Sequence, residues 1–522
     1  MSTPHWRPLS AAALTAALSL SACNNKDSGM SSETGTPPTA TTPARGTLLT
    51  SPPVKLASYS GSDLLSLLGV DSLGKELVTL AYTPTCSIDV YQIQYQTVGG
   101  MGEATTASGA LMVPTGTDSK CQGTRPIVLY AHGTTSAKAF NIAKLSTADN
   151  SEGLILAAVF AAQGYIVVAP NYAGYDTSTL TYHPYLNADQ QSKDLIDALT
   201  AAKSALPVST ATTITGNGKV FVTGYSQGGY VAMATHKALQ MAGSPPTASA
   251  PMSGPYTLSA FGDAIFMGEV PTSAPLNVAF LISSYQHAYG NVYTNTTDVF
   301  ESAYATGIDT LLPSTSSTAD LYAQGRLPQN QLFNSIPPTP QFAAMTPAPM
   351  PANLATVFAQ GFGTSNLITN AFRLNYLTDA LANPDGGFPT TTTGVPPPAM
   401  PAFGFRQDLK TNDLRNWTPT APVLLCGGNL DPTVFFLNTQ LMQQYWTGVA
   451  PSAPVTVVDI DSSGEPYSDL KTEFAAAKSL DASNAVLAGA TDGGTSAVLK
   501  DYHAGLVPTF CLSAVKRFFD TL

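Results

Sequence analysis

A serine follows an apolar run in the stretch VFVTGYSQGG, residues 220–229. The run is typical of a buried strand, and residues 230–240 have the apolar spacing of a helix that faces a core. Gly224, Ser226 and Gly228 form a G-x-S-x-G pattern. This pattern is typical of a sharp strand-to-helix turn that holds a serine hydroxyl at a helix N-terminus, where N–H groups favour a developing anion. We interpret Ser226 as a nucleophile; the alternative is a glycine-rich turn with an incidental serine.

A serine hydroxyl is a poor nucleophile at neutral pH, so it needs a base within hydrogen-bonding reach and an acid that orients the base. His503 lies in the sequence DYHAGLVP, between the last expected strand and the last expected helix. A loop there reaches the carboxyl edge of the sheet, where Ser226 is also expected. We therefore predict that His503 is the base. The other five histidines are expected to have no catalytic part: His5, His132, His183, His236 and His287. Of these, His183 is expected to be either structural or part of the lining of the substrate site.

The expected acid is Asp431, in the stretch LLCGGNLDPTV that ends a buried strand. A helix is expected to begin near Pro432, so Asp431 has the alternative role of a helix N-cap. Asp459 and Asp461, one strand later, are the fallback acids. Asp501 is too close in sequence to His503 to be its partner.

The composition excludes several classes of function. Charged residues make up 11% of the 522-residue chain, against about 25% in an average soluble protein. The formal net charge is −11 and the chain has no basic run, which argues against a nucleic-acid partner. Spacings typical of zinc ligands, of a Walker loop and of a dinucleotide-binding loop are absent from the sequence. We therefore expect a mechanism without a metal or a cofactor.

The N-terminus has the pattern of an export signal. Residues 9–22 are a short apolar run behind Arg7, too short for an ordinary transmembrane helix. The run ends in LSAC, which resembles the lipobox of bacterial lipoproteins, so residues 1–22 are predicted to be removed and Cys23 to be lipidated. Ordinary secretory cleavage is the alternative. The polar residues 23–58 are predicted to form a disordered tether, and the Asn after Cys23 favours the outer membrane.

Short apolar strands alternate with helices over much of the chain. Residues 88–113 predict an antiparallel hairpin. The strands expected after it are residues 126–133, 165–174, 219–226, 247–255, 421–433 and 454–461. The helices expected between and after them are residues 152–164, 188–206, 230–242, 434–446 and 507–522. This alternation predicts an α/β fold, with a mostly parallel sheet covered by helices on both faces.

The alternation is interrupted by residues 257–414, which are rich in aromatic residues, Pro, Ser and Thr. We interpret this segment as a cap inserted between two strands of one sheet. The core of the fold is then expected in residues 59–256 and 415–522.

The order Ser226, Asp431, His503 is that of α/β-hydrolases, and the chain from about 88 to 256 and from 415 to 522 resembles this family. The motifs AHGTT, APNYAGY, GYSQGG and GNLDPTV and the late histidine occur in the family's order. They further resemble secretory lipases and esterases with a large inserted cap. The resemblance implies an oxyanion hole formed by the backbone N–H groups of Thr134, after the His-Gly pair, and Gln227, after the nucleophile.

These observations predict an exported, lipid-anchored serine esterase or lipase that forms an acyl-enzyme. Its expected substrates are small-molecule or lipid esters with apolar acyl groups, and its expected contact with a membrane is the N-terminal lipid. Two alternatives remain open: a serine peptidase of the same fold, and a non-catalytic cell-surface module. The oligomeric state is open as well.

Four cysteines remain after Cys23, an even number in a chain expected to be exported. Cys86 and Cys121 flank the hairpin, so they are expected to be neighbours at one side of the sheet. Cys426 ends the strand before Asp431, and Cys511 lies on the closing helix. We predict disulfides Cys86–Cys121 and Cys426–Cys511; the alternative for the second pair is two buried free thiols.

Overall fold

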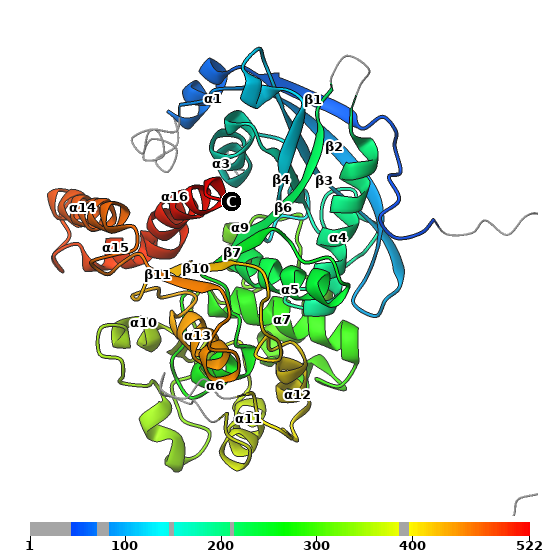
Figure 1. Cartoon of the computed structure of the whole chain (residues 1–522). Coiled ribbons are helices and arrows are strands. Elements are labelled where there is room, and N and C mark those ends of the chain that lie inside the picture. The colour runs from blue at the N-terminus through cyan, green and yellow to red at the C-terminus, as the bar shows by residue number, and fades with distance from the viewer. Residues whose placement is uncertain (1–42, 70–82, 146–150, 209–212, 386–395) are drawn as a thin grey trace, which may run out of the picture. The chain divides into compact units, whose positions relative to one another are not determined.

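The structure is a computed structural model, and it describes residues 43–69, 83–145, 151–208, 213–385 and 396–522. In these ranges one nine-stranded sheet has the order β1-β2-β3-β5-β4-β6-β7-β10-β11 (Figure 1). The strands are β1 (Val54–Tyr59), β2 (Ser87–Val98), β3 (Ala104–Thr115), β4 (Thr124–Ala131), β5 (Ile166–Pro170), β6 (Thr215–Tyr225), β7 (Ala248–Met252), β10 (Val423–Gly427) and β11 (Val455–Asp459).

The sheet is parallel from β5 to β11 and antiparallel at its other edge. β2 and β3 form the long hairpin expected from residues 88–113, and β3 pairs antiparallel with β5. All later neighbours pair in parallel. Because parallel strands share a carboxyl edge, the loops after β4, β6, β10 and β11 meet on one side of the molecule.

Helices cover both faces of the sheet, and consecutive strand residues face opposite cores, as the two-residue period of a strand requires. Val128 and Phe221 pack into one core, with α1 (Gly61–Leu68), α3 (Ser151–Val159), α14 (Ser468–Leu487) and α16 (Val507–Asp520). Leu129 and Val222, the next residue along each strand, pack into the other core, with α4 (Ala188–Ala205), α5 (Gln227–Met241) and α13 (Leu437–Val449). The α/β-hydrolase fold expected from the sequence is therefore confirmed.

A large insertion separates β7 from β10, although the two strands are parallel neighbours in the sheet. Its helices are α6 (Leu258–Phe266), α7 (Ala274–Tyr289), α8 (Ser302–Ala305), α9 (Thr318–Ala323), α10 (Ala355–Gln360), α11 (Asn370–Ala382) and α12 (Gly404–Thr411). The short strands β8 (Phe333–Asn334) and β9 (Phe362–Gly363) form a second, two-stranded sheet. The apolar interior of the insertion is continuous with the core under α4 and α5.

Two buried arginines cross-link the insertion. Arg406 on α12 forms ion pairs of 2.8 Å with both Asp263 and Asp379. Arg415, after α12, pairs with Asp385 and Asp413 at 2.5 and 2.8 Å. A buried charge is costly without a partner, so these pairs commit α6, α11 and α12 to one arrangement.

The predicted disordered tether is wrong in its second half. Residues 43–58 are part of the fold: the Gly46 N–H donates to the Gln96 carbonyl at 2.8 Å, and Arg45 pairs with Asp197 at 3.0 Å. β1 then pairs with β2. These contacts satisfy backbone groups at the sheet edge, which an alternation pattern alone does not reveal.

Residues 1–22 and Cys23 lie outside the described residues. Within the described ranges, no helix has the length and apolar character that crossing a membrane requires.

Two helices were not predicted from the sequence. They are α14 and α15 (Thr495–Asp501), which lie between β11 and His503.

Both predicted disulfides are confirmed. Cys86 joins Cys121, and Cys426 on β10 joins Cys511 on α16, with Cα–Cα distances of 5.6 Å in each bridge. The alternative of two buried free thiols is therefore wrong. The second bridge spans 85 residues of chain and fastens the closing helix to the strand that leads to Asp431.

We expect removal of the second disulfide to destabilise the fold more than removal of the first. Cys426→Ala with Cys511→Ala should lower the free energy of unfolding by about 2–5 kcal/mol, because the unfolded chain gains the freedom of a longer loop. The matched control is Cys86→Ala with Cys121→Ala, whose bridge spans 35 residues. Urea unfolding of both variants measures the difference. An unchanged unfolding midpoint for the Cys426→Ala, Cys511→Ala variant would contradict the expectation.

Candidate active site

Ser226 lies at the turn between β6 and α5 with a backbone φ of 59° and ψ of −121°, a strained conformation for a residue with a side chain. The glycines of the motif permit this turn. A Cβ atom on Gly228 would lie 1.9 Å from the Ala131 carbonyl oxygen, and one on Gly224 would lie 2.4 Å from the Gly228 oxygen. The G-x-S-x-G pattern thus reflects a close approach of the α5 N-terminus to the ends of β4 and β6.

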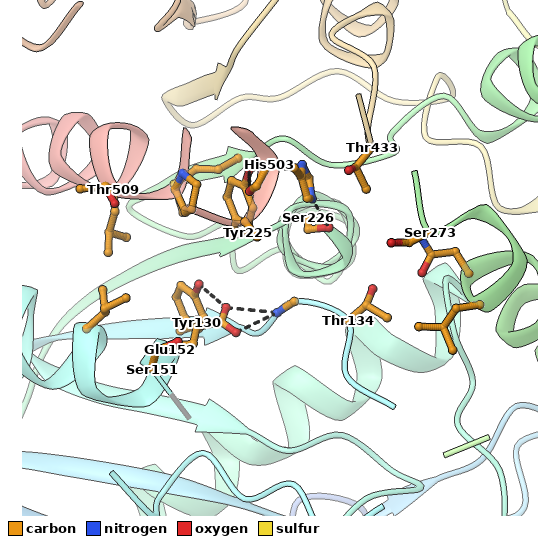
Figure 2. A pocket seen from close by; sticks show the side chains of 18 residues that line it. Tyr130, Thr134, Ser151, Glu152, Tyr225, Ser226, Ser273, Thr433, His503 and Thr509 are labelled. Atoms are coloured by element: carbon orange, nitrogen blue, oxygen red, sulfur yellow. Dashed lines mark hydrogen bonds between the residues drawn. The ribbon is translucent and has the colours of Figure 1, made fainter. Parts of the chain in front are cut away.

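Ser226, His503 and Asp431 form one chain of hydrogen bonds. The Ser226 Oγ lies 2.9 Å from His503 Nε2, and His503 Nδ1 lies 2.7 Å from Asp431 Oδ2 (Figure 2 shows the first of these contacts). A carboxylate only accepts hydrogen bonds, so the His503 Nδ1–H donates to Asp431. Nε2 is then the acceptor, with its lone pair toward the serine hydroxyl.

Asp431 contacts the base and also accepts hydrogen bonds from its own turn. Its Oδ1 accepts hydrogen bonds from the Thr433 and Val434 N–H groups at 2.9 and 3.0 Å, while its Oδ2 faces His503. It caps a turn after β10, but it is not the N-cap of a helix, because α13 begins at Leu437. The Asp431 side chain is 1% exposed, so these N–H donors take the place of water as its hydrogen-bond partners.

The fallback acids are engaged elsewhere. Asp459 accepts from the Asn429 N–H at 3.2 Å and from the Asn429 side chain at 2.8 Å. Asp461 pairs with Lys478 and accepts the Tyr502 hydroxyl at 2.7 Å. Asp461 therefore holds Tyr502, the residue before His503, whereas Asp431 contacts the imidazole.

A short π-helix, Tyr502–Leu506, carries His503 into the site. The Tyr225 hydroxyl donates to the His503 carbonyl at 2.5 Å and lies 3.3 Å from its Nδ1. Tyr502 is buried, and its hydroxyl accepts from the Leu430 N–H at 3.2 Å. Tyr225, next to Ser226, and Tyr502, next to His503, thus hold the π-helix that carries the imidazole.

Both residues expected to form the oxyanion hole are close to Ser226. Gln227 is the first residue of α5, and Thr134 follows the turn after β4 and faces the same cavity as Ser226 (Figure 2). The Gln227 side chain is buried and donates to His183 Nε2 at 2.7 Å. His183 is therefore a buried neighbour of the site, and burial lowers its pKa to about 3.

The other described histidines have structural surroundings. His132 and His236 are buried, and burial lowers the pKa of each to about 4. His132 Nδ1 lies 2.7 Å from the Gly133 carbonyl, and His236 Nδ1 lies 2.7 Å from the Ser249 hydroxyl. His287 stacks on Tyr182 in the region of the insertion.

Ser226 opens into a cavity of about 300 Å³. Its lining comes from the turn after β4, from α3, from the start of α7 and from the segment around His503 (Figure 2). The lining residues are Tyr130, Gly133, Thr134, Ser151, Glu152, Ile155, Tyr225, Ser226, Met252, Ser273, Leu276, Asn277, Thr433, His503, Ala504, Pro508, Thr509 and Leu512. Among these described lining residues Glu152 carries the one carboxyl group, and none is Lys or Arg.

Sequence reasoning missed most of this lining. Glu152 looks like an ordinary acidic residue in the first turn of a helix, and Ser273, Leu276 and Asn277 belong to an insertion without a known motif. The one available signal was the position of Glu152 at the start of the helix after the AHG strand, because such helix starts lie at the carboxyl edge of the sheet.

Comparison with known proteins agrees with the α/β-hydrolase fold. Residues 155–242, which include Ser226, match the model of the prolyl oligopeptidase family. No curated protein sequence matches the chain. Among solved structures, a ligand-bound form of LipA, a rice cell wall degrading esterase from Xanthomonas oryzae, is 26% identical, with a TM-score of 0.66 over 92% of this chain and 100% of that one.

A second crystal structure of LipA is 29% identical over 83% of this chain and 95% of that one, with a TM-score of 0.61. A putative hydrolase from Legionella pneumophila is 20% identical, with a TM-score of 0.58 over 82% of this chain and 95% of that one, and this likeness concerns the fold. The chain is a serine hydrolase with the α/β-hydrolase fold.

A fluorophosphonate probe, which reports activated serines without assuming a substrate, should label Ser226. Asp431→Asn should slow labelling by roughly 10²–10⁴-fold, because the amide no longer holds His503 in the tautomer that accepts the serine proton. The matched control is Asp459→Asn, which should label at the wild-type rate. Peptide mapping by mass spectrometry measures both; slow labelling of Asp459→Asn with normal labelling of Asp431→Asn would assign the acid to β11.

Proposed function

We propose that the protein is a serine carboxylic-ester hydrolase, an esterase or lipase that acts through an acyl-enzyme. The observation that carries the proposal is the hydrogen-bonded chain from Ser226 through His503 to Asp431, which opens into a cavity beside the sheet. In this proposal Ser226 is the nucleophile, His503 the general base and acid, and Asp431 the residue that orients His503.

The steps follow from these positions. Ser226 Oγ attacks the ester carbonyl carbon while its proton passes to His503 Nε2. The tetrahedral intermediate collapses, and the imidazolium returns the proton to the departing alcohol, which leaves Ser226 acylated. Water then attacks the acyl carbon, gives a proton to His503, and the carboxylic acid leaves as Ser226 recovers its hydrogen.

The negative charge of the tetrahedral oxygen is the main cost of each step. We assign its stabilisation to the backbone N–H groups of Thr134, which lines the same cavity as Ser226, and of Gln227, the residue after Ser226. Each such donor contributes roughly 3 kcal/mol to the transition state. The N-terminus of α5 adds a favourable field, because its peptide dipoles point toward Ser226.

An ester substrate is favoured over a peptide by the extent of the two likenesses. LipA is described as an esterase and aligns with 92% of this chain, whereas the prolyl oligopeptidase model matches residues 155–242 alone. The cavity wall also favours an apolar acyl group, because Ile155, Pro508 and Leu512 line it.

Turnover of p-nitrophenyl esters of graded chain length should exceed that of aminoacyl-nitroanilides, which carry the amide bond of a peptidase substrate. Ser226→Ala and His503→Ala should each reduce ester turnover to about the same residual rate, since the three residues act as a unit. Release of nitrophenol and nitroaniline is followed spectrophotometrically. Hydrolysis confined to the anilides would assign the protein to the peptidases, and turnover of neither by a folded protein would favour the non-catalytic module.

We also propose that the protein is exported and anchored to the cell envelope, in the outer membrane of a Gram-negative host, through lipid on Cys23. Two disulfides support an oxidising compartment. Asn24 after the cysteine supports the outer membrane rather than the inner one.

Cys23→Ser should release the protein from the membrane fraction into the soluble fraction, because it removes the atom that carries the lipid. Fractionation with detection of the intact chain measures the change. Cys426→Ala with Cys511→Ala is the control for loss of a cysteine as such, and it should stay with the membrane. Unchanged membrane association of Cys23→Ser would contradict the anchor.

A further inference from the structure

We propose that Glu152 is a positioning residue for the reaction: its carboxyl group holds Gly133, so that the next N–H along the chain, that of Thr134, faces the oxyanion. This inference rests on the proposed ester hydrolysis at Ser226. It assigns a task to a carboxyl group of the cavity that takes no part in proton transfer or nucleophilic attack.

Glu152 joins three segments at the edge of the cavity. It lies in the first turn of α3, and its Oε1 accepts the Tyr130 hydroxyl of β4 at 2.6 Å (Figure 2). The same carboxyl accepts the Gly133 N–H, at 3.1 Å to Oε1 and 3.3 Å to Oε2. The carboxyl therefore fastens the turn after β4 to the start of α3.

Gly133 is held from both sides. Glu152 binds its N–H, and His132 Nδ1 lies 2.7 Å from its carbonyl oxygen. The carbonyl and the Thr134 N–H belong to one trans peptide and point in opposite directions. Because the carbonyl faces His132, the Thr134 N–H points away from that ring. Glycine has the widest choice of backbone conformations, so this turn needs such contacts to keep one orientation.

The turn lies directly against the nucleophile. A Cβ atom built on Gly133 would be 3.6 Å from the Tyr225 carbonyl oxygen and 4.0 Å from the Ser226 Cβ. A rotation of the Gly133–Thr134 peptide would therefore change the position of a donor next to Ser226, and misplacement by about 1 Å is enough to cost roughly 100-fold in rate.

The surroundings of Glu152 make a packing role alone a poor explanation. Burial raises its pKa to about 7, while the donors Tyr130 and Gly133 oppose the rise. The other titratable groups that face it are Tyr172 and Tyr225, with His503 across the cavity. Desolvation of a carboxyl is unfavourable, and an apolar side chain would fill the same space at a lower cost.

The test compares three substitutions at Glu152. Glu152→Ala removes the acceptor, and we expect kcat for a p-nitrophenyl ester to fall about 100-fold while KM stays within about threefold, because the lost donor acts in the transition state. Glu152→Gln keeps an oxygen at the Oε1 position, and kcat should stay within about fivefold of wild type. Glu152→Asp keeps the charge but is one methylene shorter, so kcat should fall nearly as far as in the alanine variant.

Glu269→Ala is the matched control, because Glu269 is also a half-buried carboxyl with a pKa raised by burial to about 7, and it does not line the cavity. It should keep wild-type kcat and KM. The rate of phosphonylation of Ser226 by a fluorophosphonate should fall in parallel with kcat in the Glu152 series, since the phosphonyl oxygen occupies the same site as the oxyanion. Circular dichroism and thermal unfolding report whether each variant folds.

The outcomes separate this inference from the proposed function. Wild-type kcat in folded Glu152→Ala, a loss carried by KM, or a glutamine variant as slow as the alanine variant would each overturn the positioning role. If the alanine variant does not fold, a glutamine variant no faster than the aspartate variant does so. Ester turnover by Ser226→Ala would instead overturn the proposed function itself.

Discussion

The contact between the backbones of Gly228 and Ala131 sets the geometry on which the site depends. No side chain fits between the first turn of α5 and the end of β4, since a Cβ on Gly228 would lie 1.9 Å from the Ala131 oxygen. This approach places the strand ends of β4 and β6 together and forces Ser226 into its strained turn. The packing of the sheet therefore sets the positions of the turn after β4 and of the α5 N-terminus beside Ser226.

The base comes from the far end of the chain, and several contacts keep it in place. α16 is fastened to β10 by the Cys426–Cys511 disulfide, and Tyr225 holds the His503 carbonyl. Asp431 is held in turn by the N–H groups of its own turn. These supports keep His503 and Asp431 in place, and segments 72 and 277 residues apart in sequence meet within 3 Å.

The sequence was informative wherever a local pattern marked the carboxyl end of a strand. Ser226, Asp431 and His503 were expected at one edge, and the structure brings them together. Residues 43–58 were misjudged because their polar composition resembles a tether, whereas their order comes from hydrogen bonds to β2, which are tertiary contacts. Glu152 gave no motif, since its importance depends on the distance to Gly133 and not on its neighbours in sequence.

The insertion does not have an interior of its own. Its apolar residues on α6, α7, α11 and α12 belong to the same core as α4, α5 and one face of the sheet. The start of α7, which borders the active-site cavity, therefore packs into the same core as α5, the helix that follows Ser226. For protein engineering this means that the insertion is not an independent module: a chimaera must carry matching residues on α4 and α5, and a deletion would expose apolar residues of this shared core.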